Sequence, residues 1–465
     1  MLVNSRKDLI DLINQGKIKG SLTLGTLILA LGGTFLDAYD FGSIGIGVVQ
    51  LTQQLHLTSL EIGSLTASMA FGALFGALIG GKIIDKSGRM MMFVIDLVLF
   101  VLGAIGSALS INIYMLMFFR VLLGLGVGID FPVALSMIAE VSNIKNKGRN
   151  VNLWQSMWYI STVLVYIIAF VLYLNYNIFG INVWRYVIGF GAIPALIIVI
   201  LRYKYMGESP LWVFSRGSVK EINEYLKKEN YTDIEVKTLG SPITTRGFKT
   251  LFTKKYRKRT MLSASMAIEE SMEYYSIAFY LPVTLVLLFK GDVLIALLAT
   301  AAINVAGIFG GTLQSIFTFK IKIKKLAMIG LMGVFISLLI LGITGPTIII
   351  AASIILLLSF VFFHSFGQGS QAMTIGTLSY PVNIRGKGSG FTQTMVRVGS
   401  IIGFFAFPLL KASIGLYKTI LVISIFPLIV FLITLFIKWD PTDLNVDDEE
   451  FSDSESSGNP EPNAN

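Results

Sequence analysis

The chain has 465 residues, of which 54% are apolar and only 14% are charged, and its mean hydropathy is +0.73. Soluble proteins carry about 25% charged residues, so most of this surface must face lipid. Cysteine is absent and histidine occurs twice, which excludes disulfides and metal sites built from these side chains. Because no nucleophile–base pair or metal-ligand constellation is visible, an enzyme is disfavoured and no cofactor is expected.

Twelve stretches are long and apolar enough to span a membrane, for which a helix needs about 20 residues. They lie at 22–51, 60–81, 90–109, 112–138, 151–174, 184–205, 260–289, 293–317, 325–344, 346–379, 388–410 and 415–438. Six spans, a long polar loop and six more spans are typical of internally repeated secondary transporters. The predicted fold is an all-α membrane protein of twelve transmembrane helices in two six-helix bundles related by pseudo-two-fold symmetry.

These spans divide the chain into four parts. Residues 1–206 are expected to form the N-terminal bundle with a short cytoplasmic N-terminus, 207–258 a central cytoplasmic loop, and 259–439 the C-terminal bundle. In the loop, Ser and Glu at capping-box spacing, Ser218 and Glu221, predict a short amphipathic helix. Residues 440–465 carry nine acidic residues and too little apolar content to fold, so a disordered acidic tail is expected.

The positions of the charges behind the formal net charge of +9 indicate how the chain is oriented in the membrane. Of the 37 Lys and Arg residues, 31 fall in loops on the side of the N-terminus and four in the opposite loops. Positive residues concentrate in cytoplasmic loops, so both termini are predicted to lie in the cytoplasm. The protein is expected in the plasma membrane and is expected to work as a monomer. The basic balance is therefore a topology signal and does not indicate nucleic-acid binding.

A charged loop follows the second span and reads Gly81-Lys-Ile-Ile-Asp85-Lys86-Ser-Gly88-Arg89. It resembles the signature loop of the major facilitator superfamily, with Met90 in place of the last basic residue. A carboxylate among cations can form a latch that makes or breaks when two halves move. The resemblance implies a gating set of Gly81, Asp85, Lys86, Gly88, Arg89, Glu140, Arg149, Glu208 and Arg385.

Further motifs resemble branches of this superfamily. Arg120, followed by a stripe of Gly124, Gly126 and Gly128, resembles the fourth-span motif of the superfamily. Residues 207–212 read Gly-Glu-Ser-Pro-Leu-Trp and resemble the Pro-Glu-Ser-Pro-Arg-Trp element of sugar porters. The sequence Asp-Ala-Tyr-Asp at 37–40 and Gly-Ile-Asp-Phe-Pro at 128–132 resemble elements of phosphate–proton symporters, and aromatic-acid–proton symporters carry related motifs. The seventh span departs from the phosphate pattern, because Ser276 and Met272 replace its Asp and Trp.

Carboxylates within the spans are the candidates for proton coupling. Each costs about 2.5–3.5 kcal/mol at mid-bilayer, so they must face a wet cavity, pair with cations or be protonated. Asp37 and Asp40 share a helix face, Asp130 lies in the fourth span, and Glu273 lies on a seventh-span stripe with Glu269 and Tyr280. The predicted proton-coupling residues are Asp37, Asp40, Asp130 and Glu273. The alternative is structural, by pairing with Arg120 or by capping a broken helix.

Polar side chains within the spans are the candidates for substrate contact: Arg120, Gln155, Trp158, Ser276, Tyr280, Asn304, Gln368, Gln371 and Arg397. Uncharged amides also hydrogen-bond between helices, so packing is the alternative for each. Asp96 has no assigned role.

These observations predict a secondary active transporter, a proton-coupled symporter that imports a small polar solute by alternating access. Organic carboxylate, phosphate and sugar remain open as substrates. The alternatives are an exporter or antiporter of the same fold, or a nutrient sensor that does not transport. The expected partners are the substrate, protons and the lipid bilayer.

Overall fold

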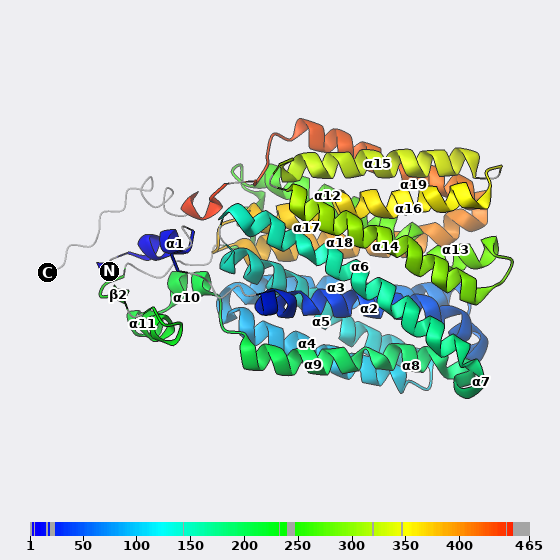
Figure 1. Cartoon of the computed structure of the whole chain (residues 1–465), viewed down its shortest axis with the longest axis horizontal. Coiled ribbons are helices and arrows are strands. Elements are labelled where there is room, and N and C mark those ends of the chain that lie inside the picture. The colour runs from blue at the N-terminus through cyan, green and yellow to red at the C-terminus, as the bar shows by residue number, and fades with distance from the viewer. Residues whose placement is uncertain are drawn as a thin grey trace.

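The computed structural model describes residues 2–3, 5–14, 17–18, 24–142, 144–231, 233–239, 247–318, 320–345, 347–442 and 444–449. Nearly all of them lie in helices that run side by side along the long axis of the molecule (Figure 1). One end of this bundle carries α1 (Arg6–Asn14), α10 (Pro210–Arg216) and α11 (Val219–Lys228). This end is called the terminal face below.

The first half of the chain supplies six passes between the two ends of the bundle. They are α2 (Leu24–Leu55), α3 (Ser59–Ser87), α4 (Arg89–Ala108), α5 (Ile113–Val141), α6 (Ile144–Leu174), and a sixth pass built from α7 (Tyr176–Phe179), η1 (Gly180–Asn182), α8 (Val183–Phe190) and α9 (Ala192–Tyr205).

The second half repeats this layout with two interrupted passes. Its elements are α12 (Arg257–Ile277), α13 (Leu281–Leu288), α14 (Val293–Phe317), α15 (Ile323–Thr344), α16 (Ile350–Phe366), α17 (Gln368–Leu378), α18 (Arg385–Ile414) and α19 (Leu416–Phe436). Among the described residues, eleven helical stretches are long and apolar enough to cross a membrane, and each corresponds to a predicted span. The predicted seventh span is formed by α12 and α13. It is not among these eleven stretches, because it is too rich in acidic and hydroxyl side chains.

Glycine lets α3 and α5 pack closely within the first half. A Cβ added at Gly124 or Gly128 would lie 2.1 Å from a backbone carbonyl oxygen of α3, at Met69 and Ala73 respectively. No side chain fits at that distance, so the predicted small-residue stripe of the fourth span serves helix packing.

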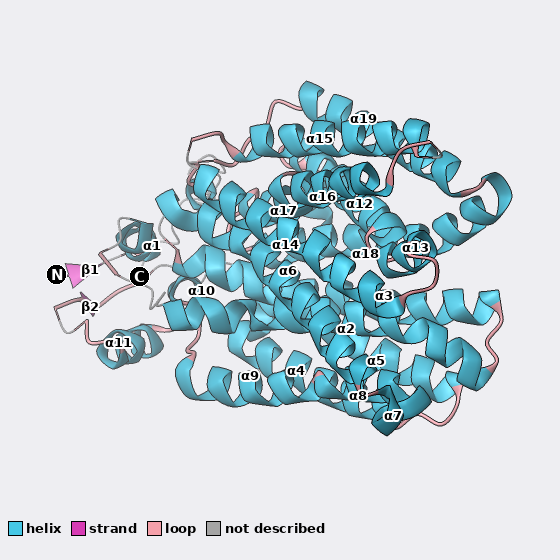
Figure 2. Ribbon diagram, turned by 45° about the vertical axis from the view of Figure 1, so that its right-hand side comes forward, coloured by secondary structure: helices cyan, strands magenta, loops and turns pink. Residues whose placement is uncertain are grey.

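The two halves meet along two long helix pairs. Helix α6 packs on α14, and α3 packs on α18 (Figure 2). The central cavity described below lies between these pairs.

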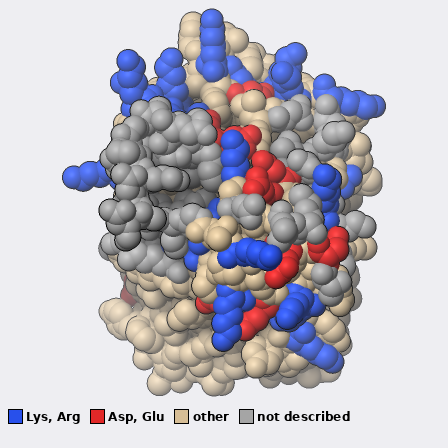
Figure 3. Space-filling view, turned by 90° about the vertical axis from the view of Figure 1, so that its left-hand side faces the viewer, with Lys and Arg blue, Asp and Glu red and all other residues tan. Residues whose placement is uncertain are grey.

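A small layer covers the terminal face. Strands β1 (Leu2–Val3) and β2 (Glu235–Val236) pair in parallel, η2 (Phe248–Phe252) precedes α12, and α11 begins with the predicted capping box of Ser218 and Glu221. Leu9, Phe214 and Ile222 are among its buried apolar residues. Lys and Arg side chains gather on this face (Figure 3).

The segment after α19 differs from the disordered tail predicted for 440–465. Asp440 accepts a hydrogen bond from the Lys324 backbone N–H at 3.2 Å, and η3 (Val446–Asp448) buries Val446 and Asp447 against the terminal face. The composition of this segment predicted disorder, because composition does not show which acidic side chains meet basic groups from other helices. Residues 450–465 lie outside the described residues.

Candidate functional site

A small cavity lies between the two halves near the middle of the bundle. Its volume is about 30 Å³, which holds about two water molecules. Side chains from α5, α6, α12, α16, α17 and α18 form its wall: Phe131, Trp154, Gln155, Trp158, Glu270, Tyr274, Tyr275, His364, Met373, Gln393, Val396 and Arg397. A larger solute therefore requires the halves to separate.

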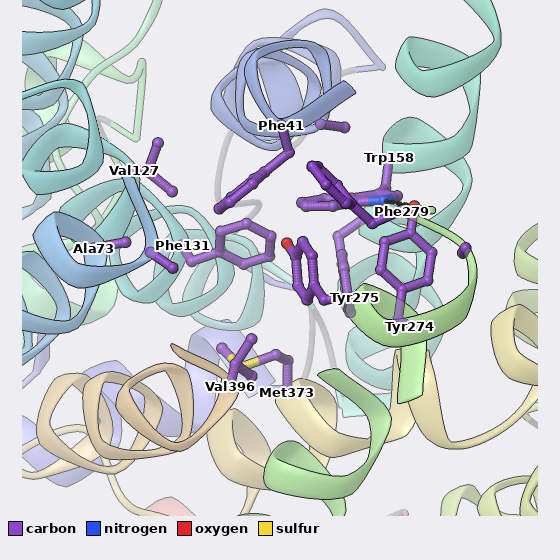
Figure 4. Packing of buried hydrophobic residues seen from close by; sticks show 14 of the residues in the cluster. Phe41, Ala73, Val127, Phe131, Trp158, Tyr274, Tyr275, Phe279, Met373 and Val396 are labelled. Atoms are coloured by element: carbon purple, nitrogen blue, oxygen red, sulfur yellow. Dashed lines mark hydrogen bonds between the residues drawn. The ribbon is translucent and has the colours of Figure 1, made fainter. Parts of the chain in front are cut away.

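Aromatic rings from both halves face each other across this cavity (Figure 4). Trp158 of α6 donates a hydrogen bond from Nε1 to the Tyr274 hydroxyl of α12 at 2.9 Å, and their ring centroids are 6.1 Å apart. Phe41 of α2 lies 5.1 Å from Tyr275 of α12 by ring centroids. Ring contacts and a hydrogen bond thus join the halves at this depth.

Amide groups in the wall are available to a ligand. Gln155 is 2% exposed and Gln393 is 1% exposed. Oε1 of Gln155 and both polar side-chain atoms of Gln393 have no hydrogen-bond partner among the described residues. Buried amides are normally hydrogen-bonded, so these groups indicate a place that a polar solute or water fills.

Arg397 of α18 brings a guanidinium to the same wall. Its Nη1 donates to the Tyr275 hydroxyl at 3.4 Å, and its Cζ lies 5.1 Å from the Phe41 ring centroid. Of the nine predicted substrate residues, Gln155, Trp158 and Arg397 line the cavity.

The other predicted substrate residues bond to neighbouring helices or, for Asn304, to its own helix α14. Ser276 and Tyr280 donate to the carbonyl oxygens of Gly403 and Phe404 at 3.4 and 3.2 Å. Asn304 donates to the Thr300 carbonyl at 2.8 Å, and Gln371 donates to Gln314 at 2.7 Å. These bonds match the packing alternative. A polar side chain can bond either a substrate or another helix, so the sequence alone could not distinguish these two roles.

Glu273 lies behind the cavity wall in a buried network. Its Oε1 is 2.6 Å from Nδ1 of His364 and accepts a hydrogen bond from Gln368 at 3.1 Å. Glu270 lines the cavity itself, with its Oε2 3.8 Å from Nε2 of His364. The predicted acidic stripe is thus completed by a histidine from α16, a distant partner that spacing within one helix could not reveal.

Asp130 and Asp96 share one cation in the first half. Arg202 of α9 lies 3.0 Å from Asp130 and 3.5 Å from Asp96, and all three side chains are buried. The structural partner of Asp130 is therefore Arg202, whereas Arg120 was the partner considered from sequence. Asp96, which had no assigned role, joins the same network. Gly33 leaves room for this carboxylate, because a Cβ there would lie 1.9 Å from Asp130 Oδ2.

Asp37 and Asp40 remain on α2, close to the cavity wall but not part of its lining. Both are almost fully buried, and neither oxygen of Asp37 has a hydrogen-bond partner among the described residues. Arg120 donates from Nη2 to the Asp40 backbone carbonyl at 2.9 Å and approaches the sulfur of Met69 at 3.0 Å. Arg120 therefore faces α2 and α3 rather than the cavity.

A buried ionic network closes the terminal face between the halves. Glu140 of α5 pairs with Arg89 of α4 at 2.5 Å and with Arg385 of α18 at 3.5 Å, so one carboxylate binds both halves. Ser209 also donates to Glu140 at 2.6 Å. The structure brings together three residues of the predicted gating set, Arg89, Glu140 and Arg385.

Glu208 extends this network to the turn before α4. It accepts the backbone N–H groups of Arg89 at 2.9 Å and Met90 at 3.2 Å, and thereby satisfies the first amides of that helix. Gly88 has φ of +86°, and a Cβ there would lie 2.4 Å from Oε2 of Glu208, so glycine is required. Arg149 bonds Asn150 at 3.3 Å. The side chains of Asp85 and Lys86, and the surroundings of Gly81, lie outside the described residues.

Asp447, in the segment after α19, adds a second bridge that sequence reasoning missed. It pairs with Arg385 at 2.6 Å and with Lys147 of α6 at 3.3 Å, and it accepts the Val382 N–H at 3.0 Å. Burial alone would raise the pKa of Asp447, but Arg385 and Lys147 outweigh it and hold that pKa below its ordinary value. Glu449 pairs with Arg259 at 2.8 Å in the same segment.

Polar groups of α6, α14 and α17 continue the seal toward the cavity. Asn152 of α6 donates to Thr318 at 2.9 Å and to Gln371 at 3.2 Å, and Gln314 donates to the Asn152 carbonyl at 2.9 Å. The cavity is thus separated from the terminal face by ionic and amide contacts between the halves.

Comparison with known proteins places this geometry in a transporter context. The sugar (and other) transporter family matches residues 25–439. The putative metabolite transport protein YaaU of Escherichia coli (strain K12) is 28% identical over 416 residues, covering 87% of this chain and 90% of that protein. The D-xylose transporter of Levilactobacillus brevis is 28% identical over 400 residues, covering 83% and 86%.

Solved structures share the fold. The proton:xylose symporter XylE bound to 6-bromo-6-deoxy-D-glucose superposes with a TM-score of 0.79 at 20% identity, covering 93% of this chain and 99% of that chain. The inward open conformation of XylE from E. coli gives a TM-score of 0.68 at 18% identity, covering 92% and 99%. The predicted fold class, two six-helix bundles of the major facilitator superfamily, is confirmed.

Proposed function

This chain belongs to the sugar (and other) transporter family, and we propose that it takes up a small polyhydroxylated solute of the sugar class together with protons. It is a multi-pass membrane transporter, and its family is one of transporters rather than enzymes. Transport would proceed by alternating access, with the two halves rocking about the central cavity.

The observation that carries this proposal is the cavity between the halves. Oε1 of Gln155 and the amide of Gln393 have no hydrogen-bond partner within the described part of the chain, and they lie beside the rings of Trp158 and Tyr275. Amides bond hydroxyl groups, and aromatic faces pack on the apolar faces of a sugar ring. A D-xylose transporter among the relatives supports a sugar over a carboxylate or phosphate, as does the presence of Glu270 in the lining next to Arg397.

The proposed proton carriers are Asp37 and Asp40 on α2. Their burial disfavours the ionised state unless a cation is near, and Arg120 and Arg397 lie within electrostatic reach of Asp40 and Asp37 respectively. The other two predicted carriers, Asp130 and Glu273, already have close partners in Arg202 and His364. We therefore assign the first pair to coupling and the second to supporting networks.

The described conformation would be an occluded one. The ionic network closes the terminal face, and the cavity volume of about 30 Å³ leaves no room for a sugar. The basic terminal face in Figure 3 supports a cytoplasmic location for both termini in the cell membrane. Because the cavity is formed by one chain, a monomer would suffice for transport.

The test is uptake by the purified chain in proteoliposomes. Radiolabelled D-xylose and D-glucose would be supplied outside, with or without an inward proton gradient. The proposal expects accumulation above the external concentration that a protonophore abolishes. Equal uptake by protein-free liposomes would refute transport. Sugar uptake that is stimulated by an outward proton gradient instead would refute symport and support an antiporter.

A further inference from the structure

Acidic groups dominate the charge around the cavity. Glu270 lines it, and Glu269 and Glu273 lie beside Glu270 on α12. Glu270 interacts electrostatically with both of these carboxyls and with Arg397. His364 of α16 also lines the cavity. It stacks on Tyr274, with ring centroids 5.1 Å apart.

Arg397 has an acidic neighbour in each half of the molecule. It interacts with Asp37 of α2 as well as with Glu270. Its guanidinium also lies near the faces of Phe41 and Phe131, at 5.1 and 5.9 Å from the ring centroids. Among the described side chains around the cavity, carboxyl groups outnumber the guanidinium, so a cationic group of a ligand has more acidic partners there than an anionic group has basic ones.

The rings around Glu270 form the second part of a cation site. Trp158 and Tyr274 meet edge to face at 6.1 Å, and Trp154 lies 6.4 Å from Trp158 by ring centroids. Aromatic faces attract ammonium groups, most strongly where water is excluded. A carboxylate surrounded by rings is the combination that recognises a protonated amine.

The unpartnered amides supply an independent indication of a ligand. Gln155 and Gln393 are buried and line the same cavity. Among the residues that the structure describes, Oε1 of Gln155 and both polar side-chain atoms of Gln393 have no hydrogen-bond partner. These groups suit hydroxyl groups on the same solute.

We propose that the cavity selects a small polyhydroxylated solute that carries a protonated amine, such as an amino sugar, and that Glu270 receives the ammonium group. This inference rests on the proposed function, since it names the substrate class of the same cavity. The rings of Trp158 and Tyr274 enclose the ammonium, and Gln155 and Gln393 bond the hydroxyl groups.

The test measures binding of three matched probes to the purified full chain by calorimetry. D-Glucosamine carries the amine, D-glucose lacks it, and N-acetyl-D-glucosamine keeps the nitrogen without its charge. At about pH 6 the amine is protonated, because amino groups of this type titrate near 8. A charge-assisted contact predicts that glucosamine binds about tenfold or more tightly than either neutral probe.

Variants connect the preference to Glu270. Glu270→Gln should reduce the preference to within about twofold, Glu270→Asp should keep a preference, and Glu224→Gln on the exposed face of α11 should change nothing. Thermal unfolding of each variant checks that it is folded.

The outcomes separate this inference from the proposed function. Equal or tighter binding of glucose than of glucosamine overturns the amine inference and leaves sugar transport standing. Failure of all three probes to bind the folded wild-type chain overturns both. An amine preference that persists in folded Glu270→Gln refutes the role of Glu270.

Discussion

Arg385 on α18 and Asp447 in the segment after α19 form a buried ion pair of 2.6 Å at the terminal face. Asp447 also reaches Lys147 on α6, in the other half of the molecule, at 3.3 Å. One carboxylate therefore bridges the halves at the point where they must separate if the cavity is to open toward this face. Opening toward this face would therefore require the segment after α19 to release this bridge.

Asp447→Asn should loosen this gate. The substitution leaves Arg385 and Lys147 with less compensating charge, which weakens the closed arrangement. The chain has no cysteine, so Met373→Cys in the cavity wall provides a single thiol. We expect a water-soluble maleimide to label it about tenfold faster in the Asp447→Asn background.

The neighbouring acid provides the control for that experiment. Asp448 is exposed, and Asp448→Asn should leave the labelling rate unchanged. If both substitutions accelerate labelling equally, the effect is one of overall tail charge, and the bridge has no specific role.

Acid should open the same gate. The closed state holds the pKa of Asp447 below its ordinary value of 3.8, so its contribution to closure is complete above about pH 4 and is lost as the pH falls below that value. Because maleimide reacts with the thiolate, each labelling rate is divided by that of a free thiol at the same pH. We expect this ratio to rise on acidification in the wild-type background and to change much less in Asp447→Asn. A parallel acid response in both would assign it to other groups.

The sequence predicted the helices well because hydropathy depends on composition within a segment. The twelve spans and the amphipathic α11 follow from local pattern, and even the acidic α12 was found. Partners that come from distant segments could not be found in this way. Arg202 is 72 residues from Asp130 in the chain, and His364 is 91 residues from Glu273. Only packing brings these pairs together.

The candidate site shows the same division. Gln155, Trp158 and Arg397 were predicted and line the cavity, whereas Gln393 and Trp154 were not singled out. Ser276 and Asn304 have the same chemistry as cavity residues but bond neighbouring backbone carbonyls. Which face of a spanning helix looks inward depends on both halves, and one segment alone does not encode it.

The two carboxyls around Arg202 should respond differently to substitution. Asp130 makes the shorter contact, at 3.0 Å, while Asp96 lies 3.5 Å away. Two acids on one guanidinium repel each other, so Asp96→Asn removes an excess charge and should shift the melting temperature by no more than about 2 °C. Asp130→Asn should lower it by about 4 °C or more, measured by thermal unfolding in detergent. A larger loss for Asp96→Asn would reverse the assignment of the primary partner.

The coupling role of α2 can be separated from substrate binding. Asp37→Asn and Asp40→Asn each remove a titratable group while keeping size, and neither residue lines the cavity. We expect either substitution to reduce proton-driven accumulation by about tenfold or more, because a neutral amide cannot carry a proton across the cycle. Exchange of labelled for unlabelled solute, which needs no net proton movement, should continue. Asp448→Asn serves as the control for acid removal. Undiminished accumulation in both α2 variants would exclude this pair and direct attention to Asp130 and Glu273.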